Sequence, residues 1–196
     1  RIYLVTLFRL CNRIQNEMFT MFPYYKANPS GIKSKNYNQK LPTLGIFKAS
    51  PSMEKDAFEN YINTAYKQIY SWLSEGYFPD SNRNRKNKKH PVQAKWDRHN
   101  RYFWANFMNT IFSERNTVEF RLHGPTTNKQ KIVNWLFICN AILKYAMSNS
   151  RKILFSACKI SLNDVLDYYT KYGTRGEFLS EYLKAYVQSR KDAFME

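Results

Sequence analysis

Apolar residues near the start of the chain follow the spacing of one helical face. They recur three and four residues apart, and the set is Leu4, Leu7, Phe8, Cys11, Ile14, Met18 and Phe22. This spacing is typical of a helix that buries one side in a core. Pro23 cannot continue the pattern because it lacks a backbone N–H, so we expect a helix over residues 2–22. An irregular segment rich in Asn, Lys, Pro, Tyr and Ser follows over residues 23–45.

A second helical pattern covers residues 53–73. Its apolar stripe consists of Phe58, Ile62, Ala65, Ile69 and Trp72. Ser52 is a suitable N-cap because its hydroxyl can accept a hydrogen bond from a free N–H of the first turn. Glu54 and Asp56 follow, where the helix dipole favours acidic side chains. The pattern ends at Gly76.

Strict alternation of polar and apolar residues over 116–123 predicts a half-buried strand, because successive strand side chains face opposite sides. One side carries Val118, Phe120 and Leu122, and the other carries Thr117, Glu119, Arg121 and His123. Residues 101–107 are rich in aromatics, which favours a neighbouring strand over a helix, the alternative for this segment. The connection over 108–115 is short enough to close a hairpin, so we expect an antiparallel pair.

The remainder of the chain is predicted to be helical. Apolar residues at helical spacing over 129–147 predict a helix buried through Ile132, Trp135, Leu136, Cys139, Ile142, Leu143 and Ala146. Capping boxes at 161–164 and 174–177 predict two further helices, in which Phe178, Tyr182, Leu183 and Tyr186 look like core residues. The expected fold class is α+β, an antiparallel sheet with flanking helices. We predict a domain over residues 1–150, with a basic loop over 79–100, and a C-terminal helical extension over 151–196.

Composition supports a packed protein. The chain has 196 residues, of which 43% are hydrophobic and 17% aromatic, and a disordered chain would contain fewer of both. No window approaches the run of about 18 apolar residues that crosses a bilayer. Three cysteines lie far apart without a C-x-x-C pair, which is typical of free thiols in a reducing compartment and gives no ligand spacing for zinc. We therefore expect a cytoplasmic location. The chain begins with Arg1, so we also expect that it is part of a longer protein.

The net charge of +16 makes this a strongly basic protein. Residues 83–89 contain five cations and no anion, and such a surplus attracts polyanions. Basic and aromatic residues also alternate over 96–104, where aromatic side chains could stack on bases. A nucleic-acid-binding module of a phage or mobile element is therefore an alternative function. Residues 83–89 lack aromatic or apolar residues, however, and the pattern favours a solvated loop.

The polar face of the strand over 116–123 concentrates an acid, a guanidinium and an imidazole in Glu119, Arg121 and His123. In the simplest interpretation these side chains pair with cross-strand neighbours and contribute about 0.2–1 kcal/mol each. The same three groups also suit a face that holds a metal, a phosphate and a carboxylate. The chain has no P-loop and no G-x-G-x-x-G motif, so the common nucleotide-binding loops are absent.

Four motifs, taken in order, resemble the C-terminal half of the amidoligase family. They are Arg101-Tyr102 with Asn106, the strand from Thr117 to His123, the turn at Thr126-Thr127, and the helix containing Asn134-Trp135. Members of that family have an R-Y-x-x-x-N segment before a T-[IV]-E-F-R-x-H strand, then a G-T turn and a helix with a central N-W. They are carboxylate–amine ligases with a glutamine-synthetase-like fold, and the resemblance implies a partial domain of that kind here.

The resemblance implies an ATP-dependent ligase that forms an amide through an acyl phosphate, with carboxylate and amine substrates that are small molecules or peptides. Phosphoryl transfer of this kind uses metal ions and cations to neutralise phosphate oxygens. Glu119 would then be a Mg²⁺ ligand, because hard carboxylates suit hard cations. Arg121 would clamp a phosphate or carboxylate through its two-pronged guanidinium, and Arg101 and Asn106 would join it from the neighbouring strand.

Other residues have smaller implied roles, and some depart from the family pattern. His123 would help to position substrate, while Lys33 and Lys35 would close over the phosphates from the long loop. Asn38 stands where the family has Cys, and Pro125 lies inside the turn. The family's G-x-E-x-E strand and H-x-H element do not occur in this sequence. The chain would therefore hold only part of an active site, and a catalytically degenerate scaffold is a further alternative.

Overall fold

The computed structural model describes residues 1–22, 40–41, 44, 52–75, 103–112, 114, 116–155 and 159–194. In this part of the chain it is mostly helical, with one small antiparallel sheet, which agrees with the α+β prediction. The elements in chain order are α1 (Ile2–Thr20), α3 (Lys55–Glu75), β1 (Ala105–Asn106), α5 (Met108–Phe112), β2 (Glu119–Phe120), α6 (Lys129–Ser148), α7 (Ser150–Phe155), α8 (Leu162–Leu166), the 3-10 helix η2 (Asp167–Tyr172) and α9 (Thr174–Asp192).

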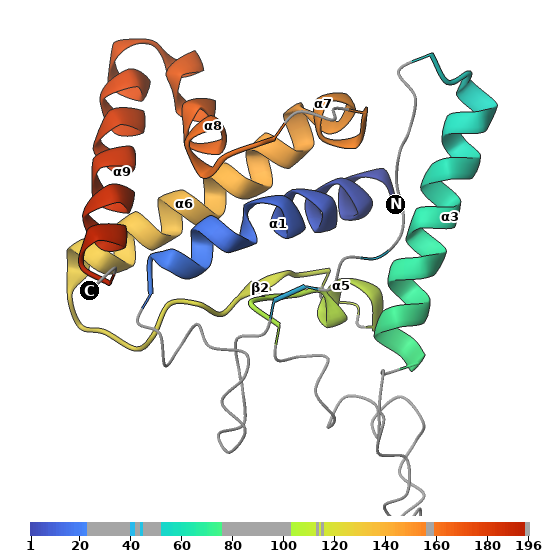
Figure 1. Ribbon diagram of the computed structural model, residues 1–196, viewed down its shortest axis with the longest axis horizontal. Helices are drawn as coiled ribbons and strands as arrows, with labels where there is room; N and C mark the ends of the chain where they lie inside the picture. The colour runs from blue at the N-terminus through green and yellow to red at the C-terminus, as the bar shows by residue number, and fades with distance from the viewer. Residues whose placement is uncertain are drawn as a thin grey trace, which may run out of the picture.

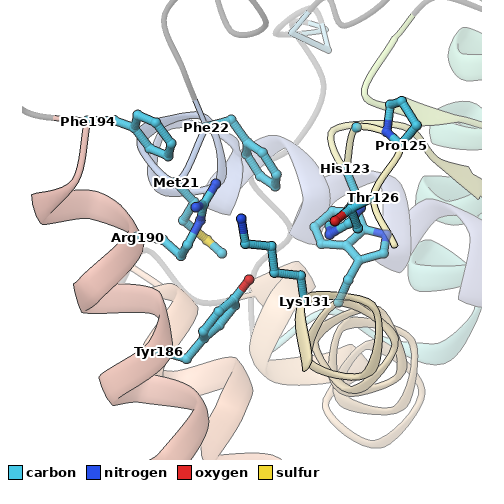
Figure 2. Close-up of a pocket in the computed structure, with 11 residues that line it drawn as sticks. Met21, Phe22, His123, Pro125, Thr126, Lys131, Tyr186, Arg190 and Phe194 are labelled. Atoms are coloured by element: carbon cyan, nitrogen blue, oxygen red, sulfur yellow. The ribbon is translucent and has the colours of Figure 1, made fainter. Parts of the chain in front are cut away.

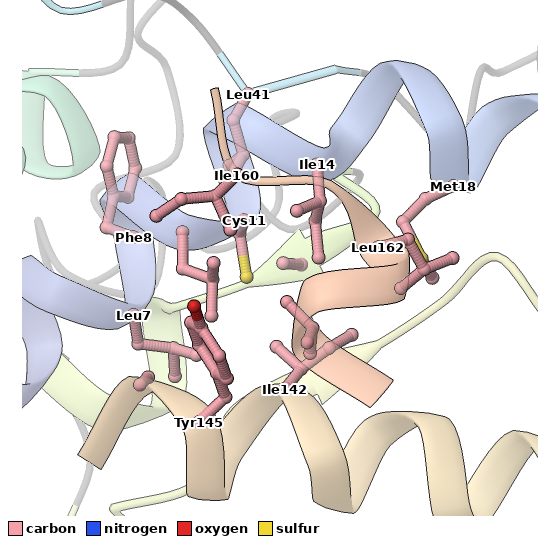
Figure 3. Packing of buried hydrophobic residues seen from close by; sticks show 14 of the residues in the cluster. Leu7, Phe8, Cys11, Ile14, Met18, Leu41, Ile142, Tyr145, Ile160 and Leu162 are labelled. Atoms are coloured by element: carbon pink, nitrogen blue, oxygen red, sulfur yellow. The ribbon is translucent and has the colours of Figure 1, made fainter. Parts of the chain in front are cut away.

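Helix α1 lies at the centre of the core, as its apolar spacing predicts. It packs along α6 and also contacts α3, α7 and α8 (Figure 1). Its inward face includes Leu10, Cys11 and Ile14, which have no exposed surface. Figure 3 shows Cys11 and Ile14 of α1 meeting Ile142 and Tyr145 of α6, together with residues such as Leu41 and Leu162 from other segments. One continuous hydrophobic core therefore joins the N-terminal helix to the helices at the C-terminal end.

Helix α3 confirms the second helical pattern, but its start differs from the prediction. Ile62, Ala65 and Ile69 of the predicted stripe are buried. The helix begins at Lys55, and Phe58 N donates to the Glu54 carbonyl oxygen at 2.9 Å. Ser52 therefore lies too far from the first turn to be the N-cap residue. Ser is the better N-cap residue by propensity, which led to the prediction of Ser52. The helix nevertheless begins after Glu54, so Glu54 occupies the N-cap position.

The helix over 129–147 is confirmed as α6, but its buried face was only partly identified. Ile142 and Ala146 are buried as predicted, whereas Leu136 is 62% exposed and Ile132 is 40% exposed. The buried stripe instead consists of Asn134, Ile138, Ala141, Ile142, Tyr145 and Ala146. This helix is apolar around much of its circumference, so its sequence pattern cannot select the face that meets α1.

The two predicted strands pair in antiparallel fashion, but each is shorter than its sequence pattern. Ala105 lies opposite Phe120, and Asn106 lies opposite Glu119. The short helix α5 connects them, and Arg121 N donates to the Trp104 carbonyl oxygen at 2.8 Å, which extends the pairing beyond β2. The alternation over 116–123 is confirmed at its apolar face, because Leu122 is fully buried and Val118 and Phe120 pack on the core.

The C-terminal helices confirm one capping prediction and contradict the other. The Ser161 hydroxyl accepts a hydrogen bond from Asp164 N, and the Asp164 carboxylate accepts one from Ser161 N, which forms the predicted capping box of α8. Helix α9 instead has Gly173 at its N-cap, with φ +70°, and no side-chain cap. Glycine suits this left-handed backbone better than other residues. The proposed box at 174–177 is therefore wrong.

Two of the aromatic residues assigned to the core of α9 lie on its surface. Phe178 is 74% exposed and Tyr182 is 37% exposed, whereas Leu183 is fully buried. The side of α9 that meets η2 includes Gly176, where an added Cβ would overlap the Tyr169 carbonyl oxygen. This close backbone approach determines which face of α9 is buried. The periodic pattern of apolar residues does not predict that face.

Within the described residues, no helix combines the length and the apolar content that a membrane span requires. Cys11 and Cys139 are free thiols. Burial raises the pKa of Cys11 well above its usual range, and burial also raises the pKa of Cys139 to about 12. Neither side chain is therefore a ready thiolate, and Cys11 is a core residue. Cys158 lies outside the described residues.

Candidate functional site

Three predicted site residues meet at the strand pair, and we call Asn106, Glu119 and Arg121 the strand-pair cluster. Arg121 Nη2 donates to Glu119 Oε2 at 2.6 Å, and Asn106 Nδ2 donates to the same oxygen at 3.1 Å. The register explains this contact, since Asn106 and Glu119 lie directly opposite each other in the ladder. Arg121 reaches the same carboxylate because side chains two residues apart on a strand share a face.

The cluster becomes more exposed from Asn106 toward Glu119. Asn106 is 4% exposed, and its Oδ1 accepts a hydrogen bond from Met108 N at 3.0 Å. The Asn106 amide therefore forms hydrogen bonds through both of its polar atoms, through Oδ1 with the start of α5 and through Nδ2 with the Glu119 carboxylate. The side chains of Arg121 and Glu119 are 21% and 46% exposed. A pair this accessible contributes about 0–1 kcal/mol to folding, so the fold does not depend on it.

Glu119 is the residue for which the family resemblance implies a role as a Mg²⁺ ligand. Among the described residues, no group of three His, Cys, Asp or Glu side chains gathers at one point. Mg²⁺ commonly binds through one or two carboxylates and completes its shell with water and substrate phosphates. A single exposed carboxylate fits an ion that arrives with a nucleotide, and does not fit a metal cage built wholly by the protein.

The other predicted site residues are not in the cluster. His123 lies just beyond β2, and its ring is tilted against that of Trp135 of α6, with centroids 5.5 Å apart. It lines a separate pocket of about 220 Å³. Arg101, Lys33 and Lys35 lie outside the described residues, as do the basic run over 83–89 and Asn38. Their predicted roles at the phosphates stay predictions.

The pocket beside His123 contains residues that sequence reasoning did not select, above all Lys131, Tyr186 and Arg190. We call it the basic pocket, and it is lined by Met21, Phe22, His123, Gly124, Pro125, Thr126, Lys131, Trp135, Tyr186, Arg190 and Phe194. Figure 2 shows Lys131 and Arg190 directed into the same space from α6 and α9. These positions are far apart in the sequence, so no motif spacing would have linked them.

Comparison with known proteins confirms the resemblance in the middle of the chain. Residues 49–143 match the model of the family described as "putative amidoligase enzyme". The match covers just under half of the chain, includes the complete strand-pair cluster, and ends within α6 before the C-terminal helices. Neither the curated proteins nor the solved structures gave a match.

Proposed function

We propose that the protein is an ATP-dependent carboxylate–amine ligase with a glutamine-synthetase-like catalytic domain, which forms an amide through an acyl phosphate. The observation that carries this proposal is the strand-pair cluster, which lies inside the segment that matches the amidoligase family. The match itself supports a ligase-type function. The cluster adds a carboxylate and a guanidinium held on one face of a sheet, which is a suitable arrangement for phosphoryl transfer.

Each member of the cluster has a distinct task in this proposal. Glu119 would hold Mg²⁺, whose chemistry is to neutralise the oxygens of the transferred phosphate. Arg121 would bind a phosphate or carboxylate in two-pronged fashion. Its ion pair with Glu119 aligns the guanidinium in advance, so that little side-chain freedom is lost when the anion arrives. Asn106 is a positioning residue, because its amide holds the Glu119 carboxylate from the opposite strand.

The remaining predicted residues would act around this centre. Arg101 precedes β1 in sequence and would add a second cation to the cluster, while Lys33 and Lys35 would close over the phosphates. His123 lies two residues beyond Arg121 and would orient a substrate from the adjoining pocket. The substrates would be a carboxylate and an amine, borne by small molecules or peptides.

The proposal is tested by thermal unfolding of the full-length protein with Mg-ATP. Ligand at about 100 times its Kd adds about 2.7 kcal/mol, or roughly 5–10 °C in Tm for a chain of this size. We expect this rise in the wild type and its loss in Arg121→Ala. Arg151→Ala is the matched control, because Arg151 is an exposed arginine on α7. An equal rise in wild type and Arg121→Ala would remove Arg121 from the nucleotide site.

Turnover provides the second test. Glu119→Ala and Arg121→Ala should each abolish amide formation in the complete enzyme while the protein stays folded. Removal of one group that stabilises developing charge costs about 10²–10³ in rate in well-studied enzymes. Undiminished turnover in either variant would contradict the proposed role of the strand-pair cluster.

A second candidate function rests on the net charge of +16. Binding to nucleic acid would release counterions from the phosphates, so affinity would fall steeply with salt. Filter binding of an oligonucleotide should then show a salt slope that decreases when the cations of residues 83–89 are replaced by Gln. If no oligonucleotide is retained at low salt, this candidate is eliminated and the ligase proposal is unaffected.

A further inference from the structure

The basic pocket is formed by segments from four regions of the chain. Helix α9 and the residues just after it supply Tyr186, Arg190 and Phe194. Across from them lie the first turns of α6, the 123–126 segment after β2, and the end of α1. Figure 2 shows Lys131 extending from α6 toward Arg190, with the Tyr186 hydroxyl directed into the same space. The pocket therefore depends on α9, which lies outside the segment that matches the family.

The polar groups of the pocket favour an anion. Among the residues that the structure describes, its lining includes the cations Lys131 and Arg190 together with the His123 imidazole, and no Asp or Glu. Neither cation forms an ion pair with a described residue. The neighbouring Lys191 differs, because its Nζ lies 3.5 Å from Glu17 Oε2. Two adjacent basic residues of α9 thus have opposite environments: within the described part of the chain, Lys191 has a carboxylate partner and Arg190 has none.

The position of the α6 N-terminus adds to this preference. Thr126 and Lys131 bracket the first turn of that helix, whose N-cap is Asn128. The N-terminal end of a helix carries partial positive charge. Burial raises the pKa of Tyr186, although Arg190 acts in the opposite direction. The Tyr186 hydroxyl therefore stays protonated at neutral pH and can donate a hydrogen bond.

The rest of the lining is apolar and aromatic. The Trp135 ring lies edge-on to Phe22, with centroids 5.7 Å apart, and tilts against His123 at 5.5 Å. The Arg190 guanidinium lies over the Phe194 ring at 4.6 Å from its centroid. Ligand sites of this type combine hydrophobic walls with a few convergent polar groups, and drug-sized examples occupy about 300–1,000 Å³. A volume of about 220 Å³ suits a smaller ligand, with one ring system.

We propose that the basic pocket binds a small organic oxyanion, either a carboxylate or a phosphate monoester, that carries one aromatic ring system. Arg190 and Lys131 hold the anionic group, Tyr186 donates to it, and the ring lies against Trp135 and Phe22. Binding does not require the ligase activity proposed above, because none of these residues belongs to the strand-pair cluster. A protein without ligase activity would still bind the anion.

The experiment is a titration of the full 196-residue chain, observed by two-dimensional ¹H–¹⁵N NMR at low salt. The probes are phenyl phosphate and indole-3-acetate, which separate the two sources of the anion. Inorganic phosphate supplies the charge without a ring, and benzyl alcohol supplies a ring without charge. The chain has four tryptophans, so the indole signal of Trp135 can be assigned with Trp135→Phe. Millimolar Kd values are the scale expected for ligands of one ring.

The expected result is a saturable shift of the Trp135 indole signal by one or both ring-bearing anions. Arg190→Gln and Lys131→Gln should each weaken this binding by about tenfold or more, because each removes a charge-assisted hydrogen bond. Arg175→Gln is the matched control. Arg175 is an exposed arginine on the same helix, about 22 Å from Arg190 along the axis, and its removal should leave Kd unchanged.

Three results would overturn the proposal. The first is the absence of any saturable Trp135 shift at millimolar probe. The second is an unchanged Kd in both Arg190→Gln and Lys131→Gln. The third is equal binding of inorganic phosphate or benzyl alcohol, which would show that charge or ring alone is sufficient. Loss of Mg-ATP stabilisation with retained anion binding would remove the proposed ligase function and leave this inference in place.

Discussion

The strand-pair cluster and the basic pocket are neighbours in sequence, since Arg121 belongs to one and His123 to the other, yet their charges are arranged differently. In the cluster the Arg121 guanidinium and the Asn106 amide both donate to the Glu119 carboxylate. In the pocket Lys131 and Arg190 converge, and the described lining residues include no carboxylate. The charges of Arg121 and Glu119 balance each other within the cluster. The cations of the pocket would be balanced by the anion proposed above.

This difference in charge balance means that the cluster is the more preorganised region and that the pocket attracts an anion more strongly. In the function proposed above, the ion pair would keep the side chains of the cluster aligned before a substrate arrives, and a metal or phosphate would have to compete with that ion pair. An uncompensated pocket attracts an anion directly, but salt screens that attraction over a Debye length of about 8 Å at physiological ionic strength. The two sites also rest on different supports: the ladder between β1 and β2 holds the cluster, and the packing of α9 on η2 holds one side of the pocket.

The largest expected effect comes from breaking the support of the pocket alone. Gly176→Ala places a methyl group against the Tyr169 carbonyl oxygen, so α9 must move away from η2. Overpacking of this kind costs about 1–3 kcal/mol, occasionally more. We expect a lower urea midpoint and weaker binding of phenyl phosphate, with Mg-ATP stabilisation retained. Arg175→Ala, on the same turn but exposed, is the control, and equal midpoints for the two variants would contradict the packing argument.

Breaking the support of the cluster should have a comparable but smaller effect. Asn106→Ala leaves the buried Met108 N–H without its acceptor and removes the amide that holds Glu119. A buried donor without a partner costs about 1–3 kcal/mol. Urea unfolding should show this loss, while anion binding in the basic pocket stays at the wild-type level. Asn163→Ala, at an exposed position of α8, should be close to wild type in both measurements.

Acid should weaken the C-terminal support through Asp164. Burial alone would raise the pKa of this carboxyl, but hydrogen bonds from the Ser161 hydroxyl and backbone N–H lower it overall from its ordinary value of 3.8. A lowered folded-state pKa means that the contribution to stability is complete above the unfolded pKa and is lost as pH falls through the folded pKa. Asp164→Asn should therefore flatten the fall in stability below about pH 4.

The same capping box can be tested at neutral pH, where its carboxylate is charged. Ser161→Ala removes the cap of α8 and should cost about 1 kcal/mol in urea unfolding. Thr174→Ala should have little effect, because the Thr174 side chain does not cap α9. Equal losses of unfolding free energy in Ser161→Ala and Thr174→Ala would contradict the conclusion that a side chain caps α8 but not α9.

The smallest expected effect on stability belongs to the ion pair of the cluster. Glu119→Gln should change the free energy of unfolding by less than about 1 kcal/mol, because the pair is partly exposed. If Glu119 holds Mg²⁺ as proposed, turnover should nevertheless be lost, since Gln cannot replace the charge of the carboxylate at the metal. A double-mutant cycle with Arg121→Gln would measure the coupling directly. A coupling well above that range would indicate that the pair has a structural role.

Local patterns in the sequence determined much of the fold. Helical periodicity identified α1, α3 and α6, and alternation over 116–123 identified the strand whose polar face carries Glu119 and Arg121. The Ser161 box was also readable, because a hydroxyl and a carboxylate three residues apart satisfy the same turn. These features depend on residues that are near one another in the chain. For the same reason, the family motif could be recognised before any contact was known.

Tertiary structure decided what periodicity leaves open. It selected Asn134 and Ile138 rather than Ile132 and Leu136 for the buried side of α6, because that choice depends on the position of α1. It set Asn106 opposite Glu119, since register is a property of two strands. It also brought Arg190 to Lys131 through the packing of α9. A sequence specifies local conformation through adjacent residues, but a site between distant segments exists only once burial of the core has fixed how those segments meet.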